Sequence, residues 1–163
     1  MPYRFAYLAE HPEHVDTIAG WWHREWAEMS GLGLDGWRVA AKRQLQTDAI
    51  PLGVVALDDD ETLAGVASLV DHEATGFPPA EPRLANVYVP AEHRRQGLGS
   101  ALTERIADEA ARLGVEDLWL YTNSQERLYA RLGWTTTERF EKDGWGPSVV
   151  MVRRLVGVRG TSA

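Results

Sequence analysis

The sequence predicts one α/β domain, in which helices cover both faces of a mixed sheet of about seven strands. Two stretches of helical periodicity, near residues 12–29 and 97–113, are separated by short strand-like runs. The second stretch crosses over between two strands, which implies parallel pairing, whereas an acidic turn at residues 58–61 implies an antiparallel hairpin. Both kinds of pairing are therefore expected in one sheet, with about four helices around it.

The first half of the chain supplies two helices and three strands. Pro12 suits the first turn of a helix, and apolar residues follow from Val15 at helical spacing. Gly31, Gly33 and Gly36 are expected to break that helix. The elements expected, in order, are a strand at 3–8, helices at 12–29 and 37–46, and a hairpin of strands at 52–57 and 62–71.

The second half begins after a proline-rich loop around Pro78. Leu98, Leu102 and Ile106 form one apolar stripe of a helix that Gly114 closes. The elements expected, in order, are a strand at 84–89, a helix at 97–113, a strand at 118–122, a short helix at 125–132, and strands near 134–140 and 148–155.

The length and composition suit a single domain, because no repeat or linker divides the 163 residues. We expect one domain over residues 1–163, with a core at 3–155 and a flexible tail at 156–163. The net charge of −7 argues against a nucleic-acid partner, since phosphate binding needs a basic face, and it favours a cationic substrate such as an amine. No signal peptide or membrane span is visible, which predicts a cytoplasmic protein without a membrane partner.

Two kinds of chemistry are excluded by residue content. The chain has no cysteine, so it has neither disulfides nor a thiol nucleophile. His11 and His14 stand alone, without further residues at metal-ligand spacing, and no metal site is predicted.

The strongest functional signal is a strand, a basic turn, two glycines and a helix at residues 86–100. The first N–H groups of a helix have no partner within it, and this end carries about half a positive charge. Gly97 and Gly99 leave room for phosphate oxygens near those groups, and Arg94 and Arg95 add charge-assisted hydrogen bonds. The segment therefore indicates a pyrophosphate site.

Two other phosphate-binding loops fit this segment less well. A Walker loop needs Lys after its second glycine, where Ser100 stands, and a dinucleotide fingerprint needs a third glycine, where Leu102 stands. The alternative is a solvated basic turn, whose glycines serve only tight packing between helix and strand.

The pattern Arg94-x-x-Gly97-x-Gly99 resembles the acetyl-CoA signature of the GCN5-related N-acetyltransferases (GNAT). Residues 128–134 resemble the family's second motif, commonly written L-Y-x-x-x-G-F. The order of elements from residue 3 to 155 also matches, so the chain resembles a bacterial-type single-domain member of that family.

The resemblance implies that a bulge splays the central strand from its parallel neighbour and that the pantetheine of acetyl-CoA lies in the gap. Family members often carry Asn where Thr122 stands, one residue before Asn123. Asn123 and Glu126 also have the pattern of a helix N-cap pair. The cofactor-binding residues implied are Val87, Tyr88 and Val89 for pantetheine, Arg94, Arg95, Gln96, Gly97, Leu98, Gly99 and Ser100 for the pyrophosphate, and Asn123 for a further contact.

Acetyl transfer from a thioester to an amine needs a proton donor for the leaving thiolate and a free-base amine. Tyr129 is the candidate acid, because a phenol of pKa near 10 is protonated at neutral pH and can donate to a thiolate of pKa near 8.5. The alternative role for Tyr129 is a core residue that uses its hydroxyl as a hydrogen-bonding group.

The candidate bases lie where the third strand ends. Glu73 is the first choice, acting directly or through water, and His72 is the second; both can instead be solvated residues of a strand end. On the first two helices, Trp22 and the residue one turn later, Trp26, are expected in the core. The side chains expected to line a cleft for an amine cation are Trp21, Trp37, Glu25 and Glu28.

The sequence therefore predicts an acetyl-CoA-dependent N-acetyltransferase that acts by direct attack of a primary amine in a ternary complex. The amine belongs either to a small molecule or to a protein or peptide. A non-catalytic module that senses acyl-CoA is the alternative, and the sequence is compatible with a homodimer.

Overall fold

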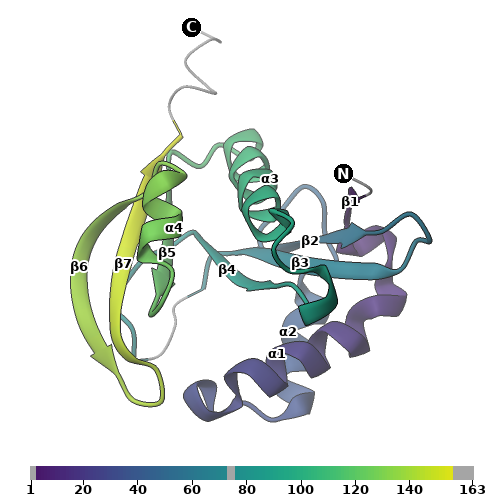
Figure 1. Cartoon of the computed structure of the whole chain (residues 1–163), viewed down its shortest axis with the longest axis horizontal. Coiled ribbons are helices and arrows are strands. Elements are labelled where there is room, and N and C mark those ends of the chain that lie inside the picture. The colour runs from purple at the N-terminus through teal and green to yellow at the C-terminus, as the bar shows by residue number, and fades with distance from the viewer. Residues whose placement is uncertain (1–2, 73–75, 156–163) are drawn as a thin grey trace, which may run out of the picture.

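The computed structural model describes residues 3–72 and 76–155 and contains a mixed sheet with helices on both faces (Figure 1). The predicted tail at 156–163 and the candidate base Glu73 lie outside the described residues. The strands are β1 (Arg4–Tyr7), β2 (Leu52–Leu57), β3 (Leu63–Val70), β4 (Arg83–Tyr88), β5 (Asp117–Thr122), β6 (Thr135–Lys142) and β7 (Gly146–Arg154). The helices are α1 (Val15–Ser30), α2 (Leu34–Arg43), α3 (Leu98–Arg112) and α4 (Glu126–Arg131), with 3-10 turns at Leu8–Glu10, Pro12–His14 and Ala91–His93.

The seven strands lie in the order β1-β2-β3-β4-β5-β7-β6. β4 and β5 are parallel, whereas the other neighbouring pairs are antiparallel. The predicted α/β class and the mixed pairing are thus confirmed. Because a parallel pair needs a crossover, α3 connects β4 to β5 across one face of the sheet.

The central strand β4 carries a bulge. Val66 of β3 pairs with Tyr88, and Ser68 pairs with Ala85, so β4 holds one extra residue between these two pairs. Asn86, inside this step, has a positive φ of 56°, which is uncommon for a residue other than glycine. A bulge bends its strand and increases the local twist.

The bulge accompanies a separation of β4 from β5. Among the described residues, the ladder between them has the single register pair Arg83 with Trp119, supported by a 3.1 Å bond from the Trp119 N–H to the Pro82 carbonyl. From that point the two strands diverge, as the sequence resemblance implied. The indole Nε1 of Trp22 donates to the Asn86 carbonyl at 3.1 Å and so ties α1 to the bulge.

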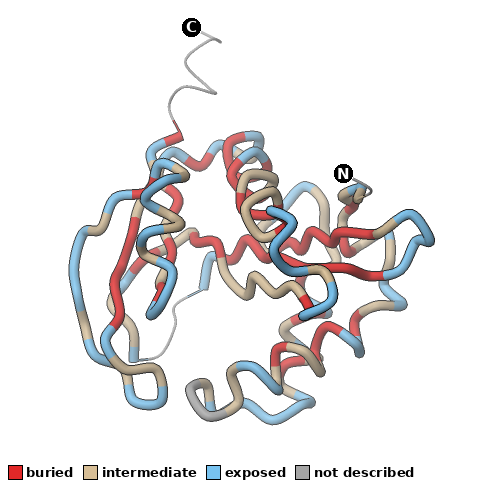
Figure 2. Tube along the Cα trace, viewed as in Figure 1, coloured by how far each residue is buried: buried red, intermediate tan, exposed pale blue. Residues whose placement is uncertain are grey.

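Two apolar cores lie on opposite faces of the sheet. α1 and α2 cover one face, and α3 and α4 cover the other (Figure 1). The predicted stripe of α3, which includes Leu98, Leu102 and Ile106, is buried. β2 and β3 are buried along their whole length (Figure 2) because helices cover both of their faces.

The position of α2 corrects the sequence prediction. The helix begins at Leu34, after an extended Gly33, and ends at Arg43, about one turn earlier than the predicted 37–46. Gly36, expected as a breaker, lies inside it. A helical glycine costs about 1 kcal/mol relative to alanine, and here the burial of Trp37 outweighs that cost.

Within the described residues, no helix combines the length and apolar character that crossing a membrane needs.

Candidate active site

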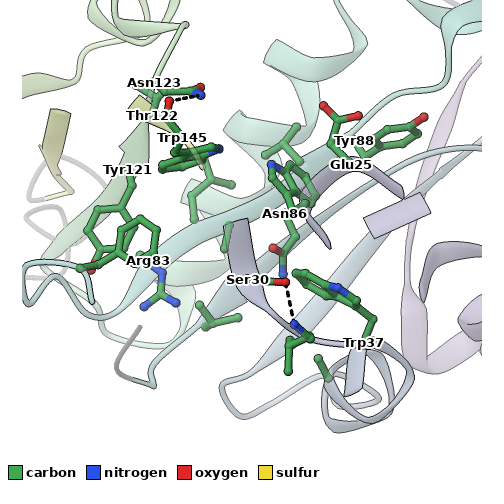
Figure 3. A pocket seen from close by; sticks show the side chains of 18 of the residues that line it. Glu25, Ser30, Trp37, Arg83, Asn86, Tyr88, Tyr121, Thr122, Asn123 and Trp145 are labelled. Atoms are coloured by element: carbon green, nitrogen blue, oxygen red, sulfur yellow. Dashed lines mark hydrogen bonds between the residues drawn. The ribbon is translucent and has the colours of Figure 1, made fainter. Parts of the chain in front are cut away.

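A cleft of about 1030 Å³ opens where β4 and β5 separate. One end is lined by Val87, Tyr88, Val89 and Arg94; these residues, with the adjacent turn at 95–100, are here called the turn end. The other end, here called the Arg83 end, consists of His72, Phe77, Arg83, Tyr121 and Trp145. Figure 3 shows Asn86 and Tyr88 of β4 on one side and Tyr121, Asn123 and Trp145 on the other.

The turn at 95–100 leaves the start of α3 open. Arg95 and Gly97 both have positive φ, of 65° and 78°, and no side chain caps the helix that begins at Leu98. A methyl group added to Gly97 or Gly99 would meet no atom within 4 Å. The glycines therefore do not serve close packing between helix and strand, which removes that part of the alternative interpretation. They leave space in front of unpaired helix N–H groups, where an oxyanion binds favourably.

Arg94 connects this turn to the cleft. Its Nε donates to the Val89 carbonyl at 2.7 Å, and its guanidinium lies 5.8 Å from the centroid of the Tyr88 ring. Arg94 lines the cleft, whereas residues 95–100 lie beside it. Leu98 is buried in the core, so it can meet a ligand only through its N–H group. Arg95 and Gln96 are exposed, and Ser100 is half-buried.

Tyr129 lines the cleft from α4, and its ring packs against Trp134 at 6.0 Å. Burial raises the pKa of the Tyr129 hydroxyl above its ordinary value, and the neighbouring Thr103 hydroxyl opposes this shift in part. The phenol is therefore protonated at neutral pH and can donate a proton within the cleft. Tyr129 therefore remains the predicted acid.

His72 lies at the Arg83 end of the cleft. β3 ends at Val70, which pairs with Arg83, so the antiparallel register places His72 on the side of Arg83 that faces away from the bulge. The His72 carbonyl accepts a 2.7 Å bond from Arg83 Nη1. Desolvation of the ring and the positive charge of Arg83 lower the pKa of His72, which keeps the imidazole neutral at pH 7.

One of the four tryptophans of the first two helices departs from its predicted role. Trp22 is fully buried, and Trp37 lines the cleft with Glu25, as expected. Trp26 packs against the core, as expected, and also lines the cleft; the α1 backbone at this residue has non-helical φ and ψ angles. Trp21 instead packs against Tyr88, with ring centroids 5.1 Å apart, and is absent from the cleft lining. The side chain of Glu28 lies outside the part of the chain that is described.

Asn123 lines the cleft, but it does not cap α4. Its Nδ2 donates to the Trp145 carbonyl at 3.2 Å, while Thr122 Oγ1 accepts the N–H of Gln125 at 3.0 Å. The predicted partner Glu126 bonds instead to Thr136 on β6. The capping interpretation of the sequence was therefore wrong, because Trp145, in the turn between β6 and β7, bonds to Asn123, and Thr136 of β6 bonds to Glu126.

An aromatic cluster at the Arg83 end was missed by the sequence reasoning. The rings of Phe77 and Tyr121 lie 4.6 Å apart, and Phe140 and Trp145 pack against Phe77 edge to face. The Arg83 guanidinium lies 5.3 Å from the centroid of the Tyr121 ring. These residues come from separate elements, so no local periodicity could have indicated that they meet.

One group of possible metal ligands gathers outside the cleft among the described residues. Ligand atoms of His11, Glu13 and His14 lie within 4.8 Å of one another. His11 Nδ1 is 3.4 Å from Glu13 Oε2, an ion pair when the ring is protonated, which gives a sufficient reason for the grouping. No metal enters the chemistry proposed below.

Comparison with known proteins agrees with this geometry. The structure superposes on that of an aminoglycoside 6′-N-acetyltransferase complexed with coenzyme A, with a TM-score of 0.73, 16% identity, and coverage of 93% of this chain and 97% of that one. It also superposes on a GCN5-related N-acetyltransferase from Kribbella flavida, with a TM-score of 0.70, 18% identity, and coverage of 94% and 98%. At these identities the similarity defines the fold, which is that of acetyltransferases.

Sequence comparison gives the family. The model described as "Acetyltransferase (GNAT) domain" matches residues 52–136. The [ribosomal protein bS18]-alanine N-acetyltransferase of Escherichia coli (strain K12) is 40% identical in an alignment of 57 residues that covers 32% of this chain and 38% of that enzyme. The chain thus aligns with less than half the length of this curated relative. Because the family model covers more than half of the chain, the chain belongs to the GNAT acetyltransferase family, as the sequence motifs predicted.

Proposed function

We propose that this protein transfers the acetyl group of acetyl-CoA to a primary amine by direct attack in a ternary complex. The observation that carries the proposal is the open start of α3 beside the separation of β4 and β5. The uncapped N–H groups of α3 receive the pyrophosphate, with Arg94 and Arg95 adding charge. Pantetheine lies along Val87, Tyr88 and Val89, and Asn123 reaches it from the opposite wall.

The transfer makes one bond and breaks one. The free amine attacks the thioester carbonyl, the new C–N bond forms, and the C–S bond breaks to release the CoA thiolate. Tyr129 gives its phenolic proton to that thiolate, and burial of Tyr129 favours the protonated phenol that this step requires. The proton lost by the amine goes to Glu73, directly or through water, with His72 as the second choice of base.

The acceptor is the amine of a small molecule or of a protein or peptide. The relative named for alanine acetylation on a ribosomal protein supports the second class, and the fold neighbours named for aminoglycosides support the first. We further propose that the protein is cytoplasmic. Association into a homodimer is a prediction that light scattering of the purified chain tests.

Thiol release from acetyl-CoA over a panel of amines tests the proposal. We expect release that depends on the amine, together with a mass increase of one acetyl group on the acceptor. Saturable binding of CoA without release for any amine would identify instead the acyl-CoA-sensing module. Absence of CoA binding in a calorimetric titration would refute the placement of the cofactor itself.

A further inference from the structure

The charge of the cleft differs from the charge of the chain. The protein has a net charge of −7. Among the described residues that line the cleft, however, Glu25 is the one carboxylate, against the four cations Arg43, Arg83, Arg94 and Lys142. Arg94 belongs to the turn end and is accounted for by the proposed function. The proposed function assigns no role to the other three cations.

Arg83 is the most buried of these cations. Arg83 is 7% exposed, and among the described residues its hydrogen bond runs from Nη1 to the His72 carbonyl. No carboxylate of the described residues lies within ion-pair distance of Arg83. Burial lowers the pKa of Arg83, and the charge of Glu81 acts on the guanidinium from farther away and partly opposes that effect; the guanidinium nevertheless stays charged, as arginine does in proteins. A buried cation with no counter-charge close by among the described residues is costly, and an anionic ligand would offset the cost.

The surroundings of Arg83 form a pocket of suitable shape. Arg43, in the last turn of α2, lines the cleft together with His72 and Arg83, and the His72 carbonyl is bonded to Arg83. The charges of Asp71 and Glu81 act to raise the pKa of His72, against the effect of the two arginines. The rings of Phe77 and Tyr121, tilted by 33° to one another, bound this end of the cleft. Figure 3 shows Arg83 beside Tyr121, so the N–H donors of a buried guanidinium lie next to an aromatic wall.

We infer that the Arg83 end binds an oxyanion, a carboxylate or a phosphate, carried by the same molecule whose amine is acetylated. A guanidinium presents parallel N–H donors that match both of these groups. The inference rests on the proposed function, since it names the class of acceptor for that reaction. It also replaces the expectation from net charge alone, which favoured a purely cationic amine.

The register of β4 sets the spacing between the two groups of the acceptor. Asn86 in the bulge is the third residue after Arg83, a separation of about 10 Å along an extended strand. The thioester lies at the bulge under the proposed function. An acceptor that reaches both positions carries its amine and its oxyanion several bonds apart, as in an ω-amino acid or an acidic short peptide, unlike a single α-amino acid.

Matched acceptors test the inference. The rate of thiol release is measured as kcat/KM for ω-aminohexanoate and its uncharged amide, and for aminohexyl phosphate and aminohexanol. We expect the anionic member of at least one pair to be preferred by about 10-fold or more, the size of a charge-assisted hydrogen bond. The two pairs distinguish a carboxylate site from a phosphate site. A ratio near one in both pairs overturns the inference.

Variants assign the preference to Arg83. In Arg83→Gln the ratio of kcat/KM between the anionic and the uncharged acceptor should fall to about one, while kcat/KM for the uncharged acceptor is retained. A loss of both kcat/KM values in equal proportion shows a structural role and overturns the inference. Using the ratio within one variant cancels any loss of folded protein. Arg83→Lys should keep part of the preference, and Arg24→Gln, an exposed arginine outside the cleft lining, should keep all of it.

Two further measurements keep the result interpretable. If Arg83→Gln does not fold, Arg43→Gln, at an exposed position, should still reduce the ratio, and an unchanged ratio counts against the inference. If wild-type protein acetylates none of these four amines, the proposed function is decided by the wider amine panel, and the inference is tested separately by calorimetric titration of ω-aminohexanoate and its amide into CoA-loaded protein. Equal affinity for the two overturns it.

Discussion

The two ends of the cleft are built from different parts of the chain. At the turn end, the groups placed for a ligand are mainly main-chain groups: the first N–H groups of α3 and the edge of β4 at its bulge. At the Arg83 end they are side chains, such as Phe77, Tyr121 and Trp145, that come from separate loops and strands. A main-chain site suits a cofactor that a whole family shares, whereas side chains can vary to suit each acceptor.

Tyr129 is the proposed proton donor for the reaction between the cofactor and the acceptor. Its replacement should have the largest effect on the rate. We expect Tyr129→Phe to lower kcat by about 10²–10⁴-fold, the usual contribution of a positioned acid, while KM for acetyl-CoA changes little. Steady-state thiol release checks both constants. Because the donor must be protonated, activity falls as pH rises through its pKa. Burial raises that pKa, so the alkaline limb should lie above the ordinary tyrosine value of about 10.

The control for this variant is a change at the ring that packs on Tyr129. Trp134→Phe keeps the phenol and loosens its surroundings, so we expect reduced stability with kcat largely retained. Comparable loss of kcat in both variants would mean that packing of α4, and not proton donation, is what the reaction requires.

The turn end is tested by charge reversal. The double variant Arg94→Glu/Arg95→Glu should raise KM for acetyl-CoA by about 100-fold, because two charge-assisted contacts to phosphate become repulsive. kcat at saturating cofactor should be nearly unchanged. Arg24→Glu, exposed on α1 and outside the cleft lining, is the control for charge reversal away from this turn, with half the change in net charge. An equal KM for the two proteins would remove the pyrophosphate from this turn.

The difference between the two ends explains what could be predicted from sequence. The turn end depends on a contiguous segment, in which Gly97 and Gly99 follow Arg94 and open a helix of clear periodicity. Its geometry is local, so local reasoning found it. The Arg83 end depends on the register between β3, β4 and β5, which places Arg83 beside His72 and Tyr121. Nothing in the residues adjacent to Arg83 indicates those neighbours.

Competition from distant parts of the chain accounts for the local predictions that failed. Asn123 and Glu126 have the spacing of a capping pair, but the Trp145 carbonyl and Thr136 take their hydrogen bonds. Trp21 has the position of a cleft residue on α1, but its ring packs on Tyr88 of β4. Periodicity predicted that the helices exist, but it could not predict which distant residues contact these side chains.

Two tryptophans test how far the bulge depends on α1. Trp22 and Trp37 are both buried, but Trp22 Nε1 donates to the Asn86 carbonyl, whereas Trp37 Nε1 has no partner among the described residues. Trp22→Phe should therefore cost about 1–2 kcal/mol more unfolding free energy than Trp37→Phe, as measured in urea. Only the first should also raise KM for acetyl-CoA, because it frees the bulge. If the two variants lose the same unfolding free energy and have the same KM for acetyl-CoA, the bulge does not depend on this hydrogen bond.

Two glycine-to-alanine variants, with the smallest expected effects, test whether the open space at the turn end serves stability or binding. Neither Gly99 nor Gly20 has a positive φ, and a methyl group at either position meets no atom within 4 Å. Gly99→Ala and Gly20→Ala should each leave stability unchanged or raise it by roughly 0.5–1 kcal/mol, because alanine loses less conformational freedom on folding. KM for acetyl-CoA should rise by about 5-fold or more in Gly99→Ala alone, since the methyl group occupies the approach of a phosphate oxygen. If both variants kept the wild-type KM, the space in front of α3 would have no ligand to explain it, and the main-chain character of this end would reflect folding alone.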